Sequence, residues 1–331
     1  MQSVREIVEE LGGFATKRGL VRHGAGDRDL TRAVRSGDVQ RVRNGWYSTA
    51  PQGDPAFRAV RLGGRLTGAS ALAAEGAWLS GRDHRLHVSV APNAARLRSP
   101  ANRRRALGGR RYRDAMVYWD RAAVRGRGTA TTVATVDAIA AFLRDAPFGS
   151  AVAVLDWALR HDRLSARDIS TITAGLPIRL RAIWEWVDPA CDSYAESIAR
   201  SGLRMAGYRV RSQVPIGARE RIDLVVEDHV ALEVDGEAHH ATRFHKDRRK
   251  DLRITVGGRH AVRITYAVLV NEWPEVLAGI EAALGARHVA VDRRLTNCTP
   301  PATAETSTAD IGRFRRLRLP EFATVAGAEW P

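Results

Sequence analysis

Carboxylates and imidazoles follow one another closely in the run ALEVDGEAHH, which extends from Ala231 to His240. The first half of this run has the apolar character of a buried β-strand, but Asp and Gly are disfavoured in strands. Buried charges are costly unless they are paired or bound to a metal ion. The run therefore predicts a functional site at the end of a strand.

A further carboxylate comes from the strand that precedes this run. The sequence predicts two strands, RIDLVV and VALEVD, joined by a turn centred on Asp228. An antiparallel pair with this centre places Asp223 opposite Glu233, with Cβ atoms about 5 Å apart. The strand period of two puts Asp223, Glu233 and Asp235 on one face of the sheet. The opposite, core face is predicted to carry Ile222, Leu224, Val226, Val230, Leu232 and Val234.

Three carboxylates on one face of a sheet repel one another unless a cation lies among them. Hard oxygen ligands suit Mg²⁺ or Mn²⁺, so we expect Asp223 and Glu233 to be metal ligands. The open alternatives are a surface salt bridge from Asp223 to Arg221 or Arg219, and an exposed acidic strand end at Glu233 and Asp235.

Other candidate residues flank the strand pair. Glu196 lies three residues after Ser193, a spacing that indicates either a helix-capping box or a site residue. His239 and His240 are interpreted as ordinary loop residues or as site residues. Asp247 and Asp251 are interpreted first as a helix cap and as i,i+4 charge neighbours, and second as site members.

The composition indicates a polyanionic partner. The chain has 331 residues and a net charge of +15, and nucleic acid is the commonest partner of such a basic protein. Only three of the 52 basic residues are lysine, a bias that a GC-rich genome produces, but exchanging Lys for Arg does not create net charge.

The sequence predicts neither a transmembrane helix nor a signal peptide. No apolar run approaches the about 18 residues that a membrane span needs, and the first residues alternate charged and apolar side chains. Cys191 and Cys298 are far apart in the chain, so we expect free thiols in a reducing cytoplasm.

Residues 2–48 predict three helices and a β-hairpin, which is the pattern of a winged helix-turn-helix. Thr16 is positioned to cap the second helix and Asp27 the third. Asn44-Gly45 is a strong signal for a two-residue hairpin turn. A winged helix places its third helix in a DNA groove and its hairpin beside it.

Arginines lie on both elements that would touch a duplex. Arg28, Arg32 and Arg35 follow the third helix, and Arg41 and Arg43 follow the hairpin. We expect these five side chains to bind DNA; a merely solvated face is the alternative.

The remaining chain predicts an α/β (α+β) protein. LTGASALAAEGAWL reads as a helix, and RLHVSVAP and AMVYWD read as strands. The run Arg103–Arg113 has six arginines, either in an exposed loop or in a phosphate-contacting one. The predicted divisions are a winged helix at 1–50, a mixed α/β and helical segment at 55–180, an αβββαβ domain at 190–288 and a partly disordered tail at 296–331.

Two segments resemble known families. The run GGFATKRGLVRHGAGDRDLTRAVRSGDVQRVRNGWYS resembles the N-terminal winged helix of AbiEi-type abortive-infection antitoxins, and LTGASALAAEG resembles the segment after it. This resemblance implies a DNA-binding or regulatory module. About 75 residues, with Glu196, RIDL, EVDGEAHH and the charged helix Asp247–Asp251, resemble the domain of unknown function 559. That family belongs to the PD-(D/E)XK nuclease superfamily, with a restriction-endonuclease-like core, and is similar to the very-short-patch mismatch repair endonuclease. The strand HAVRITYAVLV is expected to follow the charged helix.

The chain departs from the superfamily pattern at one position. That pattern places a lysine two residues after the acidic residue of the second strand, where this chain has Asp235. The lysine's role has either been lost or moved to Lys246 or Lys250, because a lysine can adjust its pKa in a site and an arginine cannot. The resemblance to the mismatch repair endonuclease implies His239 or His240 as the general base or acid instead, because imidazole titrates near neutral pH.

The resemblance implies a metal-dependent DNA endonuclease that uses Mg²⁺ or Mn²⁺ and is targeted by the winged helix. Asp223 and Glu233 are expected to hold the metal ion, with Asp235 and Glu196 assisting through water. Double-stranded DNA is the expected partner, and a toxin protein is a further one. The alternative is a DNA-binding regulator or antitoxin with a degenerate nuclease fold. RNA cleavage stays open as well, although no aromatic stacking platform supports it.

Overall fold

The computed structural model describes residues 2–81, 83–108, 114–124, 126–217, 220–235 and 244–295. Helices and strands are mixed throughout this part of the chain, which confirms the predicted α/β class. The chain forms two compact units, Met1–Arg144 with Leu164–Leu176, and Asp145–Arg163 with Pro177–Pro331. His239, His240 and the predicted tail lie outside the described residues.

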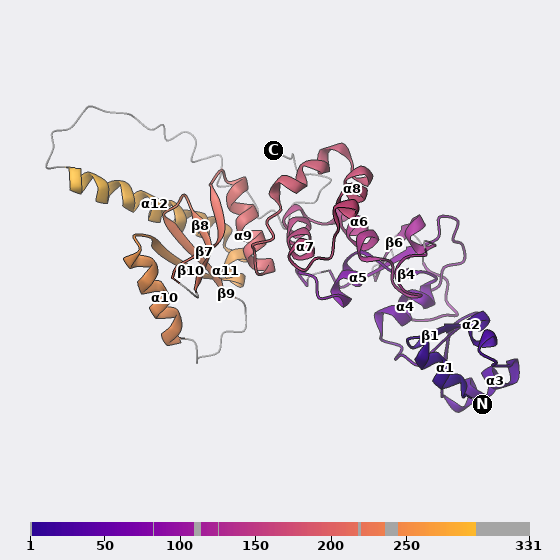
Figure 1. Ribbon diagram of the computed structural model, residues 1–331. Coiled ribbons are helices and arrows are strands. Elements are labelled where there is room, and N and C mark those ends of the chain that lie inside the picture. Colours follow the sequence, from indigo (N-terminus) through magenta and orange to yellow (C-terminus); the bar gives the residue numbers. More distant parts are fainter. Residues whose placement is uncertain are drawn as a thin grey trace. The chain divides into compact units, whose positions relative to one another are not determined.

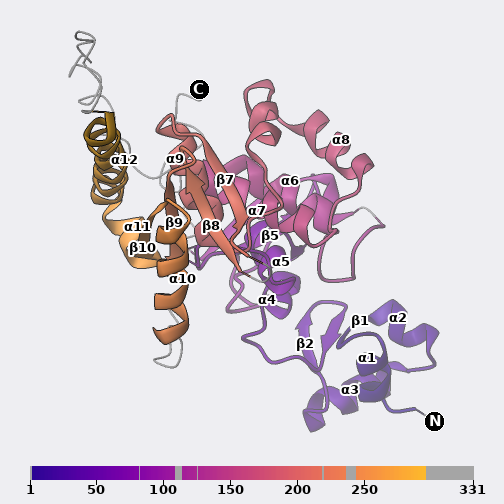
Figure 2. The same cartoon turned by 60° about the vertical axis from the view of Figure 1, so that its left-hand side comes forward.

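The first unit begins with three helices and a β-hairpin (Figure 2). Their bounds are α1 (Val4–Glu10), α2 (Lys17–Arg22), α3 (Asp27–Ser36), β2 (Gln40–Arg43) and β3 (Trp46–Ser48). A strand that the sequence did not predict, β1 (Phe14–Thr16), pairs with β3, so that the sheet order is β1-β3-β2. Thr16 caps α2 as expected, but the predicted cap of α3 at Asp27 is wrong by one residue. Gly26 is the cap, and its amide donates to the Asp29 carboxylate at 3.0 Å.

The hairpin continues into the rest of the first unit through a shared core. Phe14 and Val42 from the small sheet pack with Phe57 and Val60 from α4 (Pro55–Leu62). Burying these apolar side chains together ties the two segments into one cooperative body. The predicted segments 1–50 and 55–180 therefore both contribute to the first unit, although Asp145–Arg163 belongs to the second.

A second small sheet follows α4, in the order β4-β5-β6. Its strands and the helices around it are β4 (Arg65–Leu66), α5 (Gly68–Ala74), β5 (Leu86–Val90), β6 (Ala115–Trp119), η1 (Arg121–Ala123), α6 (Thr135–Asp145) and α8 (Ala166–Gly175). The helix predicted over LTGASALAAEGAWL is wrong at both ends. Leu66 pairs with Val88 in the sheet, and the chain leaves the helix by Gly76, where φ is +78°.

The second unit has a four-stranded sheet in the order β10-β9-β8-β7 (Figure 1). The strands are β7 (Val210–Pro215), β8 (Arg221–Val226), β9 (Val230–Asp235) and β10 (His260–Thr265), and β10 alone runs parallel to its neighbour. The helices are α7 (Phe148–Arg160), η2 (Ile178–Trp186), α9 (Tyr194–Met205), α10 (Phe244–Val256), α11 (Tyr266–Asn271) and α12 (Trp273–Leu295). The order from α9 to β10 is αβββαβ, as predicted.

Helices cover both faces of this sheet. On one face, the predicted core residues of β8 and β9 pack against α9, α11 and α12. On the other face, Ile254 of α10 packs on Val225 and Ala231. The placement predicted for Ile222 is wrong, because it joins this second cluster. The face that carries the carboxylates is thus partly apolar, with Ile222, Val225 and Ala231 packed under α10.

The strand predicted over HAVRITYAVLV is wrong in its second half. The strand β10 ends at Thr265, whose hydroxyl accepts a hydrogen bond from the Val268 amide and caps α11. The β-branched and aromatic residues of the second half suggested a strand, but Leu269 and Val270 pack instead in the core beside α12.

A buried ion pair joins α7 to α9. Arg200 donates to Asp156 at 2.8 Å, and the Ser197 hydroxyl donates to the same carboxylate at 2.7 Å. Cys191 is a buried free thiol, as expected, and burial raises its pKa to about 11. None of the helices in the described part of the chain has both the length and the apolar character that a membrane crossing requires.

Candidate active site

The predicted register of the carboxylate hairpin is confirmed. Leu224 pairs with Leu232 and Val226 with Val230, so that the turn centres on Asp228. Asp223 and Glu233 lie just beyond this ladder. There the Asp223 amide donates to Glu233 Oε1 at 3.3 Å, and the Val234 amide donates to Asp223 Oδ2 at 3.0 Å. Carboxylate oxygens thus receive the amide hydrogens that a regular strand pair would bond to carbonyls.

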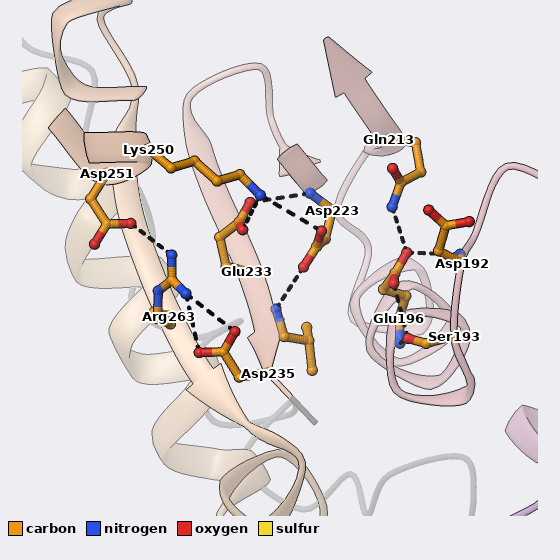
Figure 3. A network of polar contacts seen from close by, with 11 residues as sticks. Asp192, Ser193, Glu196, Gln213, Asp223, Glu233, Asp235, Lys250, Asp251 and Arg263 are labelled. Atoms are coloured by element: carbon orange, nitrogen blue, oxygen red, sulfur yellow. Dashed lines mark hydrogen bonds and ion pairs between the residues drawn. The ribbon is translucent and has the colours of Figure 1, made fainter. Parts of the chain in front are cut away.

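A lysine from α10 reaches both carboxylates (Figure 3). The Lys250 ammonium donates to Glu233 Oε2 and lies 4.0 Å from Asp223 Oδ1. Its side chain is only 17% exposed, and that of Glu233 only 5%. The ion pair is therefore largely shielded from water. Coulomb attraction between its two charges is stronger in this partly buried place than at the protein surface. Of the predicted salt-bridge partners of Asp223, Arg221 instead donates to the Gln213 carbonyl, and Arg219 lies outside the described residues.

A second ion-pair cluster lies beside the first. Arg263 of β10 donates to both oxygens of Asp235, at 3.2 and 3.3 Å, and to Asp251 of α10 at 3.1 Å. The register places Arg263 beside Glu233 in the parallel ladder. Asp235 is thus bound by an arginine from the neighbouring strand. Asp251 is thus paired with a residue of β10, and the side chain of Asp247 lies outside the described part of the chain.

Glu196 takes part in the hydrogen bonds at the start of α9 and is also a neighbour of the Asp223 carboxylate. Ser193 caps α9, and Glu196 accepts hydrogen bonds from the Ser193 hydroxyl at 2.9 Å and the Asp192 amide at 2.9 Å. The Gln213 side chain donates to Glu196 at 2.8 Å. Gln213 has a φ of +51°, a rare backbone conformation for a residue with a side chain. The strand β7 is therefore irregular at Gln213, the residue whose side chain bonds to Glu196 of α9.

Buried Glu196, buried Glu233 and half-buried Asp223 share a perturbed electrostatic environment. Burial and the nearby Asp223 carboxylate raise the pKa of Glu233 to about 7 and that of Glu196 to about 7. Burial also raises the pKa of Asp223, against the lowering effect of the Val234 amide and Lys250. Groups that titrate near neutral pH because of burial and like charge are typical of sites that bind cations or move protons.

The donor chemistry of this site fits a hard divalent cation. Half-buried Asp223 and buried Glu233 offer carboxylate oxygens that repel each other, and a cation would lower their raised pKa values. No group of three or more His, Cys, Asp or Glu side chains is arranged as a metal centre within the part of the chain that the structure describes. In this arrangement Lys250 supplies the positive charge between the two carboxylates.

The predicted DNA-binding arginines differ in their surroundings. Arg28, Arg32 and Arg35 are exposed on α3, and Arg41 is exposed on the hairpin. Arg43 is not: it is half-buried and packs against Gly63, where a side chain would collide with its guanidinium. Arg43 is thus less accessible to a duplex than the other four arginines, and DNA binding by all five stays a prediction.

Sequence reasoning missed Gln213 and Arg263. The signal that could have identified Gln213 is its long polar side chain within the strand-like run VRSQVP. Nothing in the sequence marks Arg263, since its partners lie 12 and 28 residues away in the chain. Of the other proposed site residues, the side chain of Lys246 lies outside the described part, as do His239 and His240.

A comparison with models of known protein families gives no match for this chain. A comparison with curated proteins gives no match either.

Proposed function

We propose that this chain is a metal-dependent endonuclease that hydrolyses phosphodiester bonds in DNA. The observation that carries the proposal is a pair of carboxylates on neighbouring strands, half-buried Asp223 and buried Glu233, with Lys250 reaching both from α10. Two carboxylates and a lysine in one place are the groups that metal-assisted phosphodiester hydrolysis uses.

Each residue has a distinct part in this proposal. Asp223 and Glu233 hold Mg²⁺ or Mn²⁺, which when bound activates water and neutralises charge on the phosphate. Lys250 orients the attacking water or stabilises the negative charge that develops on the phosphate oxygens. Glu196, with a pKa of about 7, accepts a proton in the neutral pH range. Arg263 holds Asp235 and Asp251 and so positions the strand and helix that carry the site.

The first unit supplies DNA binding in this proposal. The exposed arginines Arg28, Arg32 and Arg35 follow one face of α3 at intervals of three and four residues. A helix with this pattern, followed by a hairpin, suits a duplex groove. The net charge of +15 adds a long-range attraction for the phosphate backbone.

The test is cleavage of supercoiled plasmid by the full chain with Mg²⁺, with Mn²⁺ and with EDTA. Wild type is compared with Asp223→Asn and Glu233→Gln, and with Glu275→Gln, an exposed carboxylate on α12, as the matched control. We expect metal-dependent nicking in wild type and the control, and none in the two site variants. Nicking that survives in both site variants contradicts the assignment of these carboxylates.

The alternative is a DNA-binding regulator or antitoxin with an inactive nuclease fold and a toxin protein as partner. Asp235 favours it, since an acidic residue bound to Arg263 stands at the position of the superfamily lysine. Against it stands the cost of keeping Asp223 and Glu233 buried and close together. DNA binding without cleavage under every metal condition would support the regulator.

A further inference from the structure

A groove of about 430 Å³ opens in the first unit beside the hairpin. The end of α3 and strand β2 form one side of it, with Val34 and Gln40. Residues 101–103 and the helix α4 form the other side. Three of its lining residues are arginines: Arg41 of β2, Arg61 of α4 and Arg103 of the arginine-rich loop. The groove therefore combines three segments that are distant in sequence around one basic surface.

Hydrogen bonds fix the arginine-rich loop against this groove. Arg103 donates to the Arg41 carbonyl at 2.8 Å. Arg61, only 6% exposed, donates to the carbonyls of Pro100 and Ala101 at 3.2 and 3.0 Å, and its guanidinium lies 4.7 Å from the centre of the Phe57 ring. The start of the run Arg103–Arg113 is thus held beside the hairpin.

The positive charge of the groove has no counter-charge in the described residues. Arg41, Arg61 and Arg103 form no ion pair with a carboxylate there, and Arg61 Nε is buried with no hydrogen-bond partner. Burial, then Arg103 and Arg58, lower the pKa of Arg61. Neighbouring cations that repel one another in a partly buried place are costly unless an anion joins them.

We propose that this groove binds a phosphodiester of duplex DNA, next to the duplex segment that α3 contacts. The inference rests on DNA binding by the first unit in the proposed function, but not on cleavage. Of the two interpretations of the arginine run, it favours the phosphate-contacting one and assigns that contact to Arg103. It also adds two residues to the DNA interface, Arg61 through its positive charge and Asn102 through its side-chain amide donor. Arginine guanidinium groups and neutral amide donors are the groups that most often contact DNA phosphates.

The chemistry of the groove favours the DNA backbone over a free nucleotide. Phe57 is the one aromatic residue among those that line it, and it is buried beneath Arg61. No aromatic face is therefore available there for base stacking. Exposed Arg104 and Arg105 extend the basic surface beyond Arg103, as contact with an extended polyanion requires.

The test measures binding of a fluorescein-labelled 30-base-pair duplex to the full chain in EDTA, by anisotropy, across about 50 to 300 mM NaCl. The variant Arg41→Gln/Arg103→Gln is compared with Arg144→Gln, an exposed arginine on α6 that forms no ion pair within the described residues, and with Arg28→Gln/Arg32→Gln. Each lost phosphate contact lowers the slope of log K against log[salt] by about 0.9. We expect a slope smaller by about two, and roughly tenfold weaker binding at 100 mM NaCl, for the groove variant. Arg144→Gln is expected to match wild type.

The outcomes separate the groove from the other proposals. A groove variant with the wild-type slope, alongside a reduced slope for Arg28→Gln/Arg32→Gln, overturns the groove while leaving DNA binding by α3 in place. Absence of duplex binding by wild type overturns both. Because EDTA prevents metal-dependent cleavage, a failure of the nuclease proposal leaves this result unchanged. Thermal denaturation of each variant establishes that the exposed substitutions leave the fold intact.

Discussion

At the scale of single residues, the cation beside Asp223 and Glu233 does not come from their own strands. Two residues after Glu233 on β9 stands Asp235, and that side chain is bound to Arg263. The ammonium comes instead from α10 and reaches Glu233 and Asp223. A flexible four-carbon side chain allows a lysine to deliver its charge from a different element to the same place.

Replacing Lys250 tests whether its role is chemical or only electrostatic. We expect Lys250→Ala to reduce metal-dependent nicking by about 10²- to 10³-fold, the range for loss of one transition-state-stabilising donor, with duplex affinity changed by less than about twofold. Lys250→Arg keeps the charge beside Glu233 but presents a planar group of different reach, so we expect its rate to stay low. Initial rates at saturating plasmid are the measurement. A wild-type rate in Lys250→Ala would remove the lysine from the mechanism.

The raised pKa of Glu233 predicts a pH-dependent stability. A carboxyl with a folded-state pKa of about 7, above its ordinary value of 4.5, binds its proton more tightly when folded, so its contribution to stability is lost as the pH rises through 7. In EDTA we expect the melting temperature of wild type to fall more between pH 5 and pH 8 than that of Glu233→Gln. The difference in unfolding free energy is about 1–3 kcal/mol at pH 8.

The same melting temperatures measured with Mg²⁺ in place of EDTA test whether the carboxylates bind a metal ion. Mg²⁺ binds the deprotonated carboxylates, so it is expected to raise the melting temperature of wild type at pH 8 more than at pH 5, and to have little effect on Glu233→Gln. Parallel pH profiles for the two proteins would show that Glu233 titrates at its ordinary value.

At the scale of elements, α10 is the piece that completes the site. Its residue Lys250 pairs with Glu233 in the first ion-pair cluster, and Asp251 pairs with Arg263 in the second. Ile254, one turn after Lys250, is buried against Val225 and Ala231. The periodicity of the helix couples this apolar contact to the position of the ammonium. Packing of α10 on the sheet thus sets where Lys250 lies.

Removing the apolar contact of α10 should therefore affect both stability and rate. We expect Ile254→Ala to lower the free energy of unfolding by about 2–5 kcal/mol, because a fully buried side chain is lost and a cavity remains, and to reduce nicking as Lys250 loses its fixed position. Val256→Ala on the same helix, at a side chain 80% exposed, should change stability by less than about 0.5 kcal/mol. Urea denaturation followed by circular dichroism measures the stability of both variants. Equal stability of Ile254→Ala and Val256→Ala would contradict the structural role given to Ile254.

Local patterns in the sequence predicted some elements of the site and missed others. The alternation of apolar and polar residues fixed the register of β8 and β9, because a slip of one residue would turn every side chain to the other face. The strand end at Thr265 was missed because a capping hydroxyl competes with a run of β-branched residues. Gln213 and Arg263 were missed because their partners depend on packing between distant segments. Lys250 was predicted because only three lysines occur in the chain.

At the scale of the whole molecule, the two proposed activities lie in different compact units. The first unit carries the exposed arginines of α3 and the basic groove, and the second carries the carboxylates and Lys250. Interactions made with the substrate in both its ground and transition states lower KM without changing the chemical step. DNA binding by the first unit should therefore be separable from phosphodiester hydrolysis by the second.

This separation predicts opposite kinetic effects for two sets of variants of the full chain. Arg28→Gln/Arg32→Gln/Arg35→Gln should raise KM for plasmid and lower the salt slope of duplex binding by about 2.7, with kcat changed less than about twofold. Glu233→Gln should abolish kcat and leave the dissociation constant measured in EDTA nearly unchanged, since removal of a ligand of the reacting centre affects the transition state alone. A fall in kcat without a change in KM in the arginine variant would mean that α3 acts in the chemical step, and the two units would then have to work on one substrate segment together.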